Sequence, residues 1–252
     1  MNSTERFTGR AENYERYRLR YSTNEILKLL QSWCGLQPTW PIADIGAGTG
    51  MLTEVFLSNG NPVIAIEPNE EMRATCAGLQ ARWPSLQLRD ATAEATGLPG
   101  ASIAIVAAGR AFHWFDIPRA LTEFRRILQP SGWLVLVSLG RATIETPQSR
   151  DFEALLTTHA ADYTNYVRAG YRVHENLDQV FTASRHHEEI PSEQTLNWES
   201  FLGQTLSLSV TPQRDNPRFP AFNQHLHDYF NTYAINGILT MPTTCWVDAG
   251  RL

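Results

Sequence analysis

Between residues 41 and 139, short apolar runs alternate with longer segments that have a helical pattern. The runs have the length of buried strands, and the segments between them repeat with the period of amphipathic helices. Alternation of this kind over about 100 residues predicts a parallel, doubly wound sheet with right-handed crossovers. Ligands of such sheets bind outside the carboxyl ends of the strands, where the strand order reverses. We therefore expect the functional residues to follow the ends of the predicted strands.

The pattern allows each element to be placed along the chain. Strands are expected at residues 41–46, 62–67, 86–92, 103–109 and 132–139. Helices are expected at residues 12–31, 49–60, 69–83 and 118–130. Asn69 is a suitable N-cap, Gly60 closes the second helix, and Pro130 is expected to stop the last one. In the first helix, the aromatic residues Tyr14, Tyr17 and Tyr21 recur at helical spacing.

After residue 145 the alternation stops. Residues 150–168 have a helical pattern, residues 184–190 and 237–247 resemble strands, and the proline-interrupted stretch 192–235 is expected to be helical. No linker separates this part from the rest, so residues 1–252 are interpreted as a single domain. That domain has a core at about 32–145, an N-terminal cap at 1–31, and a lid with the last strands at 146–252.

The composition narrows the class of protein. Hydrophobic residues make up 42% of the 252 residues, as in ordinary soluble proteins. The net charge of -5 disfavours a nucleic-acid partner, which normally requires a basic surface. The N-terminus has no apolar signal core, and no stretch approaches the roughly 18 apolar residues that span a membrane. The three cysteines are odd in number and far apart in the sequence, which indicates reduced thiols. We expect a cytoplasmic monomer or homodimer without a membrane partner.

The first predicted strand runs into the glycine-rich turn "IADIGAGTG", residues 42–50. A dinucleotide fingerprint needs a third glycine at the position that Met51 occupies here. A phosphate loop needs a lysine after its last glycine, and Lys28 is the only lysine of the chain. The alternate glycines preceded by Asp44 therefore disfavour both of these ligand sites.

With this turn, the chain resembles the class I S-adenosylmethionine-dependent methyltransferases, whose first motif is an acid followed by alternate glycines. The resemblance covers about residues 40–138 and includes "VIAIEPNEEM", "ATAEATGLP", "AAGRAFHWFD" and "EFRRILQPSGWLVLV". The last two stretches and "YERYRLRY" are similar to the ubiquinone-type and trans-aconitate-type subgroup. The chain departs from the family at Ala104, where an acid is common, and at Ser131, where the family usually has glycine.

The resemblance implies an α/β fold with a Rossmann-like, doubly wound, seven-stranded sheet. The strands are mostly parallel with an antiparallel last strand, and the fold has an N-terminal capping helix and a C-terminal helical lid insertion. It also implies S-adenosyl-L-methionine as the cofactor and S-adenosyl-L-homocysteine as the product. In this family an acid at the position of Glu67 accepts both ribose hydroxyls in charge-assisted hydrogen bonds.

The resemblance further suggests that Asp44 orients the cofactor's ammonium group and that Arg18 pairs with its carboxylate. The implied cofactor-binding residues are Tyr14, Arg18, Asp44, Gly46, Ala47, Gly48, Glu67, Pro68, Met72, Thr92, Ala93, Glu94, Ala108 and Gly109. No metal site is expected, because the neighbouring histidines His186 and His187, and the pair His225 and His227, point in different directions on a strand and on a helix.

His113 follows the fourth strand and is the candidate general base, since the pKa of histidine lies near neutrality. The alternative is that His113 only packs the wall of the site. The aromatic residues of the lid, such as Phe152, Tyr163 and Phe201, line a substrate pocket or form the core of the lid, and both interpretations stay open.

The leading hypothesis is a methyltransferase that acts on a small molecule, with O-methylation of a carboxylate or hydroxyl favoured. Two alternatives remain: a nicotinamide-dependent oxidoreductase on a similar fold, and a non-catalytic protein that binds S-adenosylmethionine.

Overall fold

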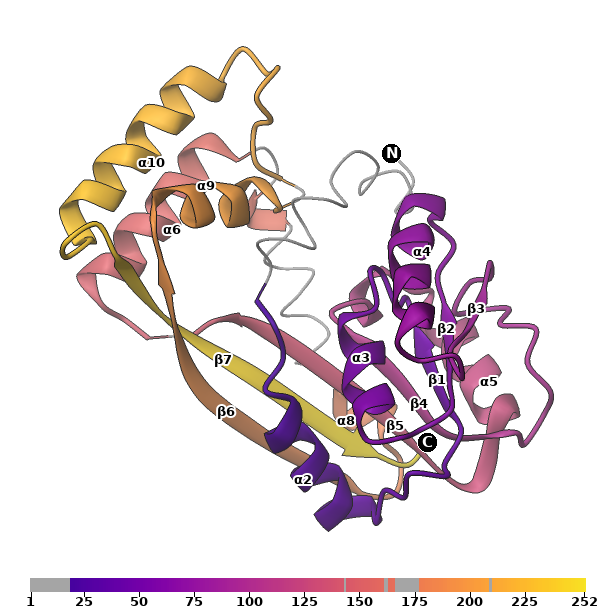
Figure 1. Cartoon of the computed structure of the whole chain (residues 1–252). Helices are drawn as coiled ribbons and strands as arrows, with labels where there is room; N and C mark the ends of the chain where they lie inside the picture. The colour runs from indigo at the N-terminus through magenta and orange to yellow at the C-terminus, as the bar shows by residue number, and fades with distance from the viewer. Residues whose placement is uncertain (1–18, 143, 161–162, 166–176, 209) are drawn as a thin grey trace.

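A single sheet organises the molecule (Figure 1). The computed structural model describes residues 19–142, 144–160, 163–165, 177–208 and 210–252. In this part of the chain the sheet has the strand order β3-β2-β1-β4-β5-β7-β6. The strands are β1 (Ile42–Ile45), β2 (Val63–Ile66), β3 (Gln87–Arg89), β4 (Ile103–Gly109), β5 (Leu128–Arg141), β6 (Arg185–Leu196) and β7 (Leu239–Gly250).

The pairing confirms the predicted Rossmann-like sheet. Strands β1 to β5 pair in parallel, and β7 runs antiparallel to both of its neighbours, β5 and β6. The strand order reverses between β1 and β4, which is where a doubly wound sheet binds its ligand. All four residues of β1 are buried, as expected for a central strand with both faces covered.

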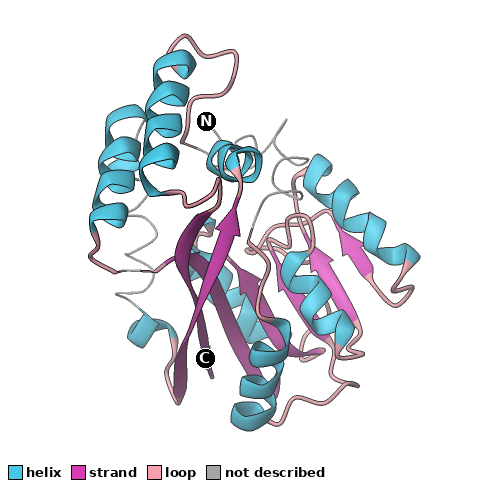
Figure 2. Ribbon diagram, turned by 60° about the vertical axis from the view of Figure 1, so that its left-hand side comes forward, coloured by secondary structure: helices cyan, strands magenta, loops and turns pink. Residues whose placement is uncertain are grey.

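Helices cover both faces of the sheet (Figures 1 and 2). On one face, α2 (Thr23–Cys34), α3 (Met51–Ser58) and α4 (Glu70–Ala77) contribute to one hydrophobic core. On the other face, α5 (Ile117–Ile127) and α8 (Leu177–Val180) contribute to a second core. The two cores bury both faces of the central strands, and the loops at the carboxyl edge of the sheet extend from these strands.

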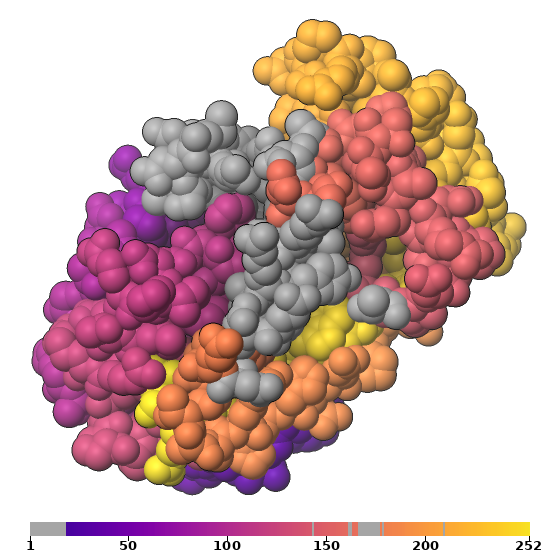
Figure 3. Space-filling model, turned by 180° about the vertical axis from the view of Figure 1, so that it is seen from behind, coloured from indigo at the N-terminus to yellow at the C-terminus, as the bar shows by residue number. Residues whose placement is uncertain are grey.

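A third cluster of helices lies beyond this edge and is called the lid. It comprises α6 (Pro147–His159), α9 (Trp198–Leu206) and α10 (Phe219–Tyr233), which share a core of their own. Strands β5 and β6 end at the lid and β7 begins there, so the lid lies at the same edge as the glycine turn. Seen from behind, the lid helices lie at the upper right and the β1–β4 half lies at the left (Figure 3). The predicted helical lid is thereby confirmed.

The helix expected at residues 12–31 begins later than predicted within the described part of the chain. Residues 19–22 are not helical and α2 begins only at Thr23, whereas residues 12–18 lie outside the described residues. Tyr21 precedes the helix and is buried against the end of β4, where a Cβ on Gly109 would lie 2.7 Å from the Tyr21 hydroxyl. Packing of this ring, and not a helical face, explains why Tyr21 is aromatic.

Two prolines led to wrong boundaries. Helix α5 ends at Ile127 instead of Pro130, because β5 already begins at Leu128. Pro130 lies in the irregular part of the β4–β5 pairing, where its missing N–H is tolerated. Strand β6 continues through Pro191 to Leu196. Residues 192–196, the start of the stretch expected to be helical, are therefore part of a strand. Strand β6 is an edge strand, and edge strands accept proline.

Candidate active site

The glycine turn follows β1 and brings bare backbone to the carboxyl edge. Gly46, Gly48 and Gly50 have φ angles of 66°, 58° and 92°, which favour glycine. A Cβ on Gly46 would lie 2.6 Å from the Cβ of Ala111, and one on Gly50 would lie 2.6 Å from a methyl group of Leu79. A Cβ on Gly48 would meet nothing within 4 Å. Gly46 and Gly50 therefore serve packing, whereas Gly48 leaves open space for a ligand.

The backbone of the turn is anchored to the neighbouring strand. The N–H groups of Gly46 and Ala47 both donate to the Ile66 carbonyl, at 2.8 and 3.1 Å. Ala47 is buried beside them. These bonds fix the turn against β2, so that it does not need a ligand to hold its shape.

Asp44 lies in β1 and is fully buried. Its Oδ2 accepts a hydrogen bond from the Thr53 hydroxyl at 2.5 Å. Its Oδ1 is buried and has no hydrogen-bond partner within the described part of the chain. Burial raises the pKa of Asp44 to about 7, against the opposing effect of the Thr53 bond. A buried carboxylate oxygen without a partner can accept a hydrogen bond from the ammonium group of a ligand or from an ordered water.

Glu67 follows β2 and reaches across to the glycine turn. Its Oε2 accepts from the Gly48 N–H at 2.8 Å, and its Oε1 accepts from the Asn69 N–H at 2.9 Å. Burial raises the pKa of Glu67, and the two N–H donors oppose that rise. Each carboxylate oxygen accepts more than one hydrogen bond, so the same group can also receive two hydroxyl donors of a ligand. The structure thus brings together Gly48 and Glu67, which are 19 residues apart.

The segment after Glu67 starts α4. Asn69 caps this helix as predicted, accepting from the Met72 N–H at 3.0 Å. Met72 is buried, and Pro68 is half-buried. Met72 therefore contributes an apolar surface under this part of the edge, while the cap sets the direction in which α4 leaves β2.

The turn after β3 contains Thr92, Ala93 and Glu94. It is closed by a bridge between Thr92 and Ala95, and Ala93 is buried beneath it. Glu94 accepts from the Asp116 N–H at 2.9 Å, which ties this turn to the loop before α5. Burial raises the pKa of Glu94, but this hydrogen bond and others outweigh burial, and the net pKa is lowered.

The exit of β4 completes the edge. Ala108 is buried, whereas Gly109 lies half-buried at the end of the strand. A short turn of 3-10 helix, η3 (Phe112–Trp114), follows. The segment packs on the glycine turn, since a Cβ on Gly46 would lie 3.4 Å from the Phe115 ring.

His113 is half-buried in η3, and its ring centroid lies 4.7 Å from that of Trp114. His113 therefore lies in the segment that follows β4 at the carboxyl edge of the sheet, and its role as a base stays a prediction. Tyr14 and Arg18, expected on the capping helix, lie outside the described residues.

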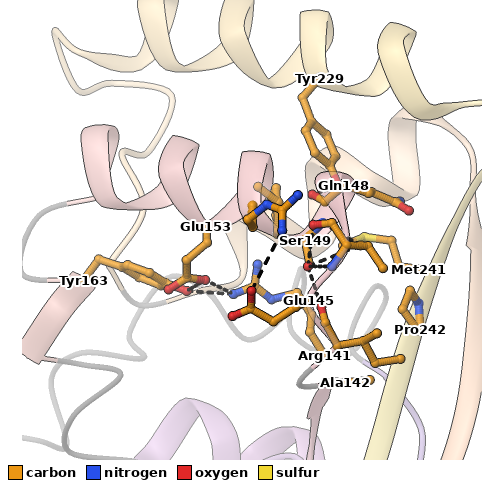
Figure 4. A pocket seen from close by; sticks show the side chains of 14 residues that line it. Arg141, Ala142, Glu145, Gln148, Ser149, Glu153, Tyr163, Tyr229, Met241 and Pro242 are labelled. Carbon is orange, nitrogen blue, oxygen red and sulfur yellow. Dashed lines mark hydrogen bonds and ion pairs between the residues drawn. The ribbon is translucent and has the colours of Figure 1, made fainter.

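A cavity of about 390 Å³ lies where the lid meets the sheet (Figure 4). Its walls come from the end of β5, the start of β7, the first half of α6, and Tyr163 and Tyr229. The Tyr163 hydroxyl donates to Glu153 Oε2 and accepts from Arg141 Nη2, both at 2.7 Å. The volume and the mixed polar and apolar lining suit a small organic molecule. Phe152 and Tyr163 line the cavity, as one of the two interpretations of the lid aromatics expected, whereas the sequence did not indicate its other walls, which come from separate segments.

Histidines of the lid meet across helices rather than along one. His159 on α6 and His225 on α10 have ring nitrogens 2.7 Å apart. Nothing within one helical segment signals this pairing. Among the described residues, no group of three or more histidine, cysteine, aspartate or glutamate side chains could hold a metal ion. Likewise, none of the described helices has the length and apolar character of a membrane span.

Comparison with known proteins agrees with this geometry. A family model described as "Methyltransferase domain" matches residues 43–136. An uncharacterized methyltransferase of Mycobacterium tuberculosis is 36% identical over 124 residues, which are 49% of this chain and 48% of that protein. The chain spans about half the length of the curated relatives it matches.

Many solved structures share the fold, and two of them illustrate the similarity. One, from Anaeromyxobacter dehalogenans and assigned as a type II methyltransferase, has a TM-score of 0.66 at 22% identity and covers 93% of this chain and 98% of its own. The other is a phosphoethanolamine N-methyltransferase of Haemonchus contortus in complex with phosphomonomethylethanolamine and S-adenosylhomocysteine. Its TM-score is 0.53 at 12% identity, and it covers 96% of this chain and 56% of its own.

Residues 43–136 match the methyltransferase domain model, and the sheet around them has the fold of the class I S-adenosylmethionine-dependent methyltransferases that the sequence resembles. S-adenosyl-L-methionine is the cofactor of this class, and the groups described above fit it. Gly48 leaves space for a ligand to approach the backbone, Asp44 offers an unsatisfied carboxylate oxygen, and Glu67 presents a carboxylate beside the turn. These features favour the methyltransferase over the oxidoreductase.

Proposed function

We propose that this protein transfers the methyl group of S-adenosylmethionine to a small molecule bound under the lid. The cavity of about 390 Å³ carries this proposal, because it lies at the same edge of the sheet as the glycine turn. Arg141 in its wall is four residues along β5 from Val137, whose carbonyl accepts from the Arg110 N–H at the end of β4. Four residues of strand span about 13 Å, a distance within the reach of a small acceptor.

Different residues of the carboxyl edge would bind different parts of the cofactor. Glu67 would receive the ribose hydroxyls, and Thr92, Ala93 and Glu94 would flank the adenine. Asp44 and the glycine turn would hold the amino-acid end. Tyr14 and Arg18 of the N-terminal cap are proposed to close over it. The cofactor supplies a methyl group on a positively charged sulfur, which makes that methyl electrophilic.

The chain's own contribution to the chemistry is positioning and proton transfer. The lid and η3 would hold the acceptor in line with the methyl group and exclude water. His113 would take the proton from an acceptor hydroxyl on its ring nitrogen, which is the reason that O-methylation is favoured. A carboxylate acceptor would need no base, and His113 would then only orient it.

The cap, core and lid are proposed to act as one domain over residues 1–252, because the lid is connected to the core by three strands of the same sheet. Separation of the lid from the core would break the pairing of β5 with β7. Cofactor and acceptor sites are then parts of one folding unit.

A methyl-transfer assay tests the proposal. The purified protein is incubated with S-adenosylmethionine labelled on its methyl group and with fractionated small metabolites, and labelled products are separated by mass. We expect the label in a small molecule, with one S-adenosylhomocysteine released per methyl transferred. Label found only in protein or nucleic acid, or cofactor binding without transfer across a broad panel, would contradict it. The second result would favour a non-catalytic binding protein.

A further inference from the structure

Arg110 is a charged residue of the carboxyl edge that the sequence motifs do not assign. It follows Gly109, the last residue of β4, and its φ angle of 55° places it in the left-handed region. This conformation is uncommon for residues other than glycine and is often found at functional positions. The Arg110 N–H donates to the Val137 carbonyl at 2.9 Å, which fixes the backbone there. The strained backbone thus directs the side chain of Arg110 in one defined direction.

That direction is toward the start of α3. Arg110 Nη2 lies 3.4 Å from the Sδ atom of Met51, the first residue of α3 and the residue after the glycine turn. The guanidinium carbon lies 5.6 Å from the centre of the Tyr21 ring, within the range of a cation–π contact. The Nε and Nη1 atoms of Arg110 are buried. Tyr21 and Met51 therefore hold the guanidinium group beside the turn.

The turn and β4 are in direct contact at this place. A Cβ on Gly46 would lie 2.6 Å from Ala111, the residue after Arg110, and a Cβ on Gly109 would lie 2.7 Å from the Tyr21 hydroxyl. Strand β4 is also the partner of β1 across the point where the strand order reverses. Arg110 is thus held at the β4 side of the turn, whereas Glu67 joins the turn from the β2 side.

These two sides suit opposite ends of the cofactor. Glu67 is proposed above to receive the ribose, so the amino-acid end would extend over the turn toward β4. That end carries a carboxylate, and the planar fork of an arginine is the side chain best matched to a carboxylate. We propose that Arg110 binds the carboxylate of the cofactor's methionine part and makes binding depend on that group. This inference rests on the proposed cofactor site, and it adds an arginine to the one expected at Arg18.

Binding measurements with two ligands test the inference. S-adenosylhomocysteine carries the carboxylate, whereas 5′-methylthioadenosine retains the adenine, ribose and thioether but lacks the amino-acid part. Isothermal titration of Arg110→Gln is expected to show a loss of affinity of roughly 10- to 100-fold for S-adenosylhomocysteine, the usual range for a lost charged hydrogen bond. The affinity for 5′-methylthioadenosine is expected to stay as in the wild type. Arg125→Gln, an exposed arginine on α5, is the matched control and should change neither affinity.

The outcomes separate the inference from the function on which it rests. If the wild type binds neither ligand, the cofactor site itself is refuted. If the wild type binds both and Arg110→Gln binds S-adenosylhomocysteine unchanged, Arg110 is not the carboxylate ligand. An equal loss for both ligands would show a structural role and would also overturn the inference. Thermal unfolding of each variant establishes that it is folded, and Arg110→Lys, which retains the positive charge, replaces Arg110→Gln if that variant proves unstable. Arg18→Gln, measured with the same two ligands, shows whether the arginine expected in the N-terminal cap also binds the carboxylate.

Discussion

The proposed cofactor site, here called the cofactor edge, and the lid cavity lie at the same carboxyl edge of one sheet, but they are assembled in different ways. At the cofactor edge, each described residue of the proposed site lies in, or shortly after, β1, β2, β3 or β4. The walls of the lid cavity come from positions as far apart as Arg141 and Pro242. A site built at strand ends is defined by backbone requirements that short motifs record. A site built between distant segments is defined by packing, which leaves no local pattern.

This difference explains which parts of the site could be predicted. The bare backbone at Gly48 and the carboxylate at Glu67 could both be predicted from residue type and spacing. Their mutual hydrogen bond could not be predicted, because it depends on how β1 and β2 pair. The side chain of Arg110 was also missed, since its direction follows from a left-handed backbone that the sequence does not reveal.

The fold follows the same division. Strands β1, β2 and β4 were predicted because their buried, apolar runs are long enough to recognise. The errors arose at Tyr21, Pro130 and Pro191, where tertiary packing or sheet position overrides a local rule. Tyr21 has helical spacing but packs on β4, and both prolines lie in strand positions that do not need their N–H.

The largest effect is expected at His113, where the two regions would meet during catalysis. His113→Ala should lower kcat on the order of 100-fold or more if the ring removes a proton from the acceptor. The affinity for S-adenosylhomocysteine should change little, because the ring is not a proposed cofactor ligand. Steady-state kinetics with an identified acceptor and calorimetry measure the two quantities. Wild-type turnover in this variant would remove the general-base role.

The next effect concerns the cofactor edge alone. Glu67→Ala should weaken S-adenosylhomocysteine binding by roughly 1–3 kcal/mol, the cost of losing a charged hydrogen-bond partner. Glu67→Gln, which keeps the shape of the side chain, is the control for the local packing around Gly48 and Asn69. Calorimetry on both variants measures the effect, and unchanged affinity in Glu67→Ala would refute the ribose role.

The glycines of the turn provide a matched pair. Gly46→Ala should lower the free energy of unfolding by about 1–3 kcal/mol, because a left-handed backbone gains a Cβ that meets Ala111. Gly48→Ala has the same backbone strain but no clash, so it should cost about 1–2 kcal/mol of stability. It should also weaken S-adenosylhomocysteine binding, because its Cβ enters the open space. Denaturant unfolding and calorimetry separate the two effects, and the reverse ranking would contradict the assignment.

A change in the lid should leave the cofactor edge intact. Tyr163→Phe removes the hydroxyl that joins Glu153 and Arg141, and should cost about 1.5 kcal/mol of stability. The KM for the acceptor should rise, while the affinity for S-adenosylhomocysteine stays at the wild-type value. A comparable loss of cofactor affinity would show that the two regions are coupled more tightly than proposed.

The smallest effect is a pH dependence confined to the lid. Burial, and then the neighbouring His225, lower the pKa of His159 below its usual 6.5. The folded lid thus favours neutral His159, so its stabilising contribution is complete above pH 6.5 and is lost as the pH falls through that value toward the lowered pKa. His159→Gln should reduce this loss of Tm in scans between about pH 7.5 and about pH 5. The same pH slope in wild type and variant would rule out this pair as the source.

The most direct test of the whole account is a crystal structure with S-adenosylhomocysteine bound. The account predicts that the ribose hydroxyls contact Glu67, that the turn at Gly48 lies under the ligand, and that the sulfur faces His113 and the lid cavity. A ligand bound away from Glu67, or a sulfur turned away from the lid, would contradict it.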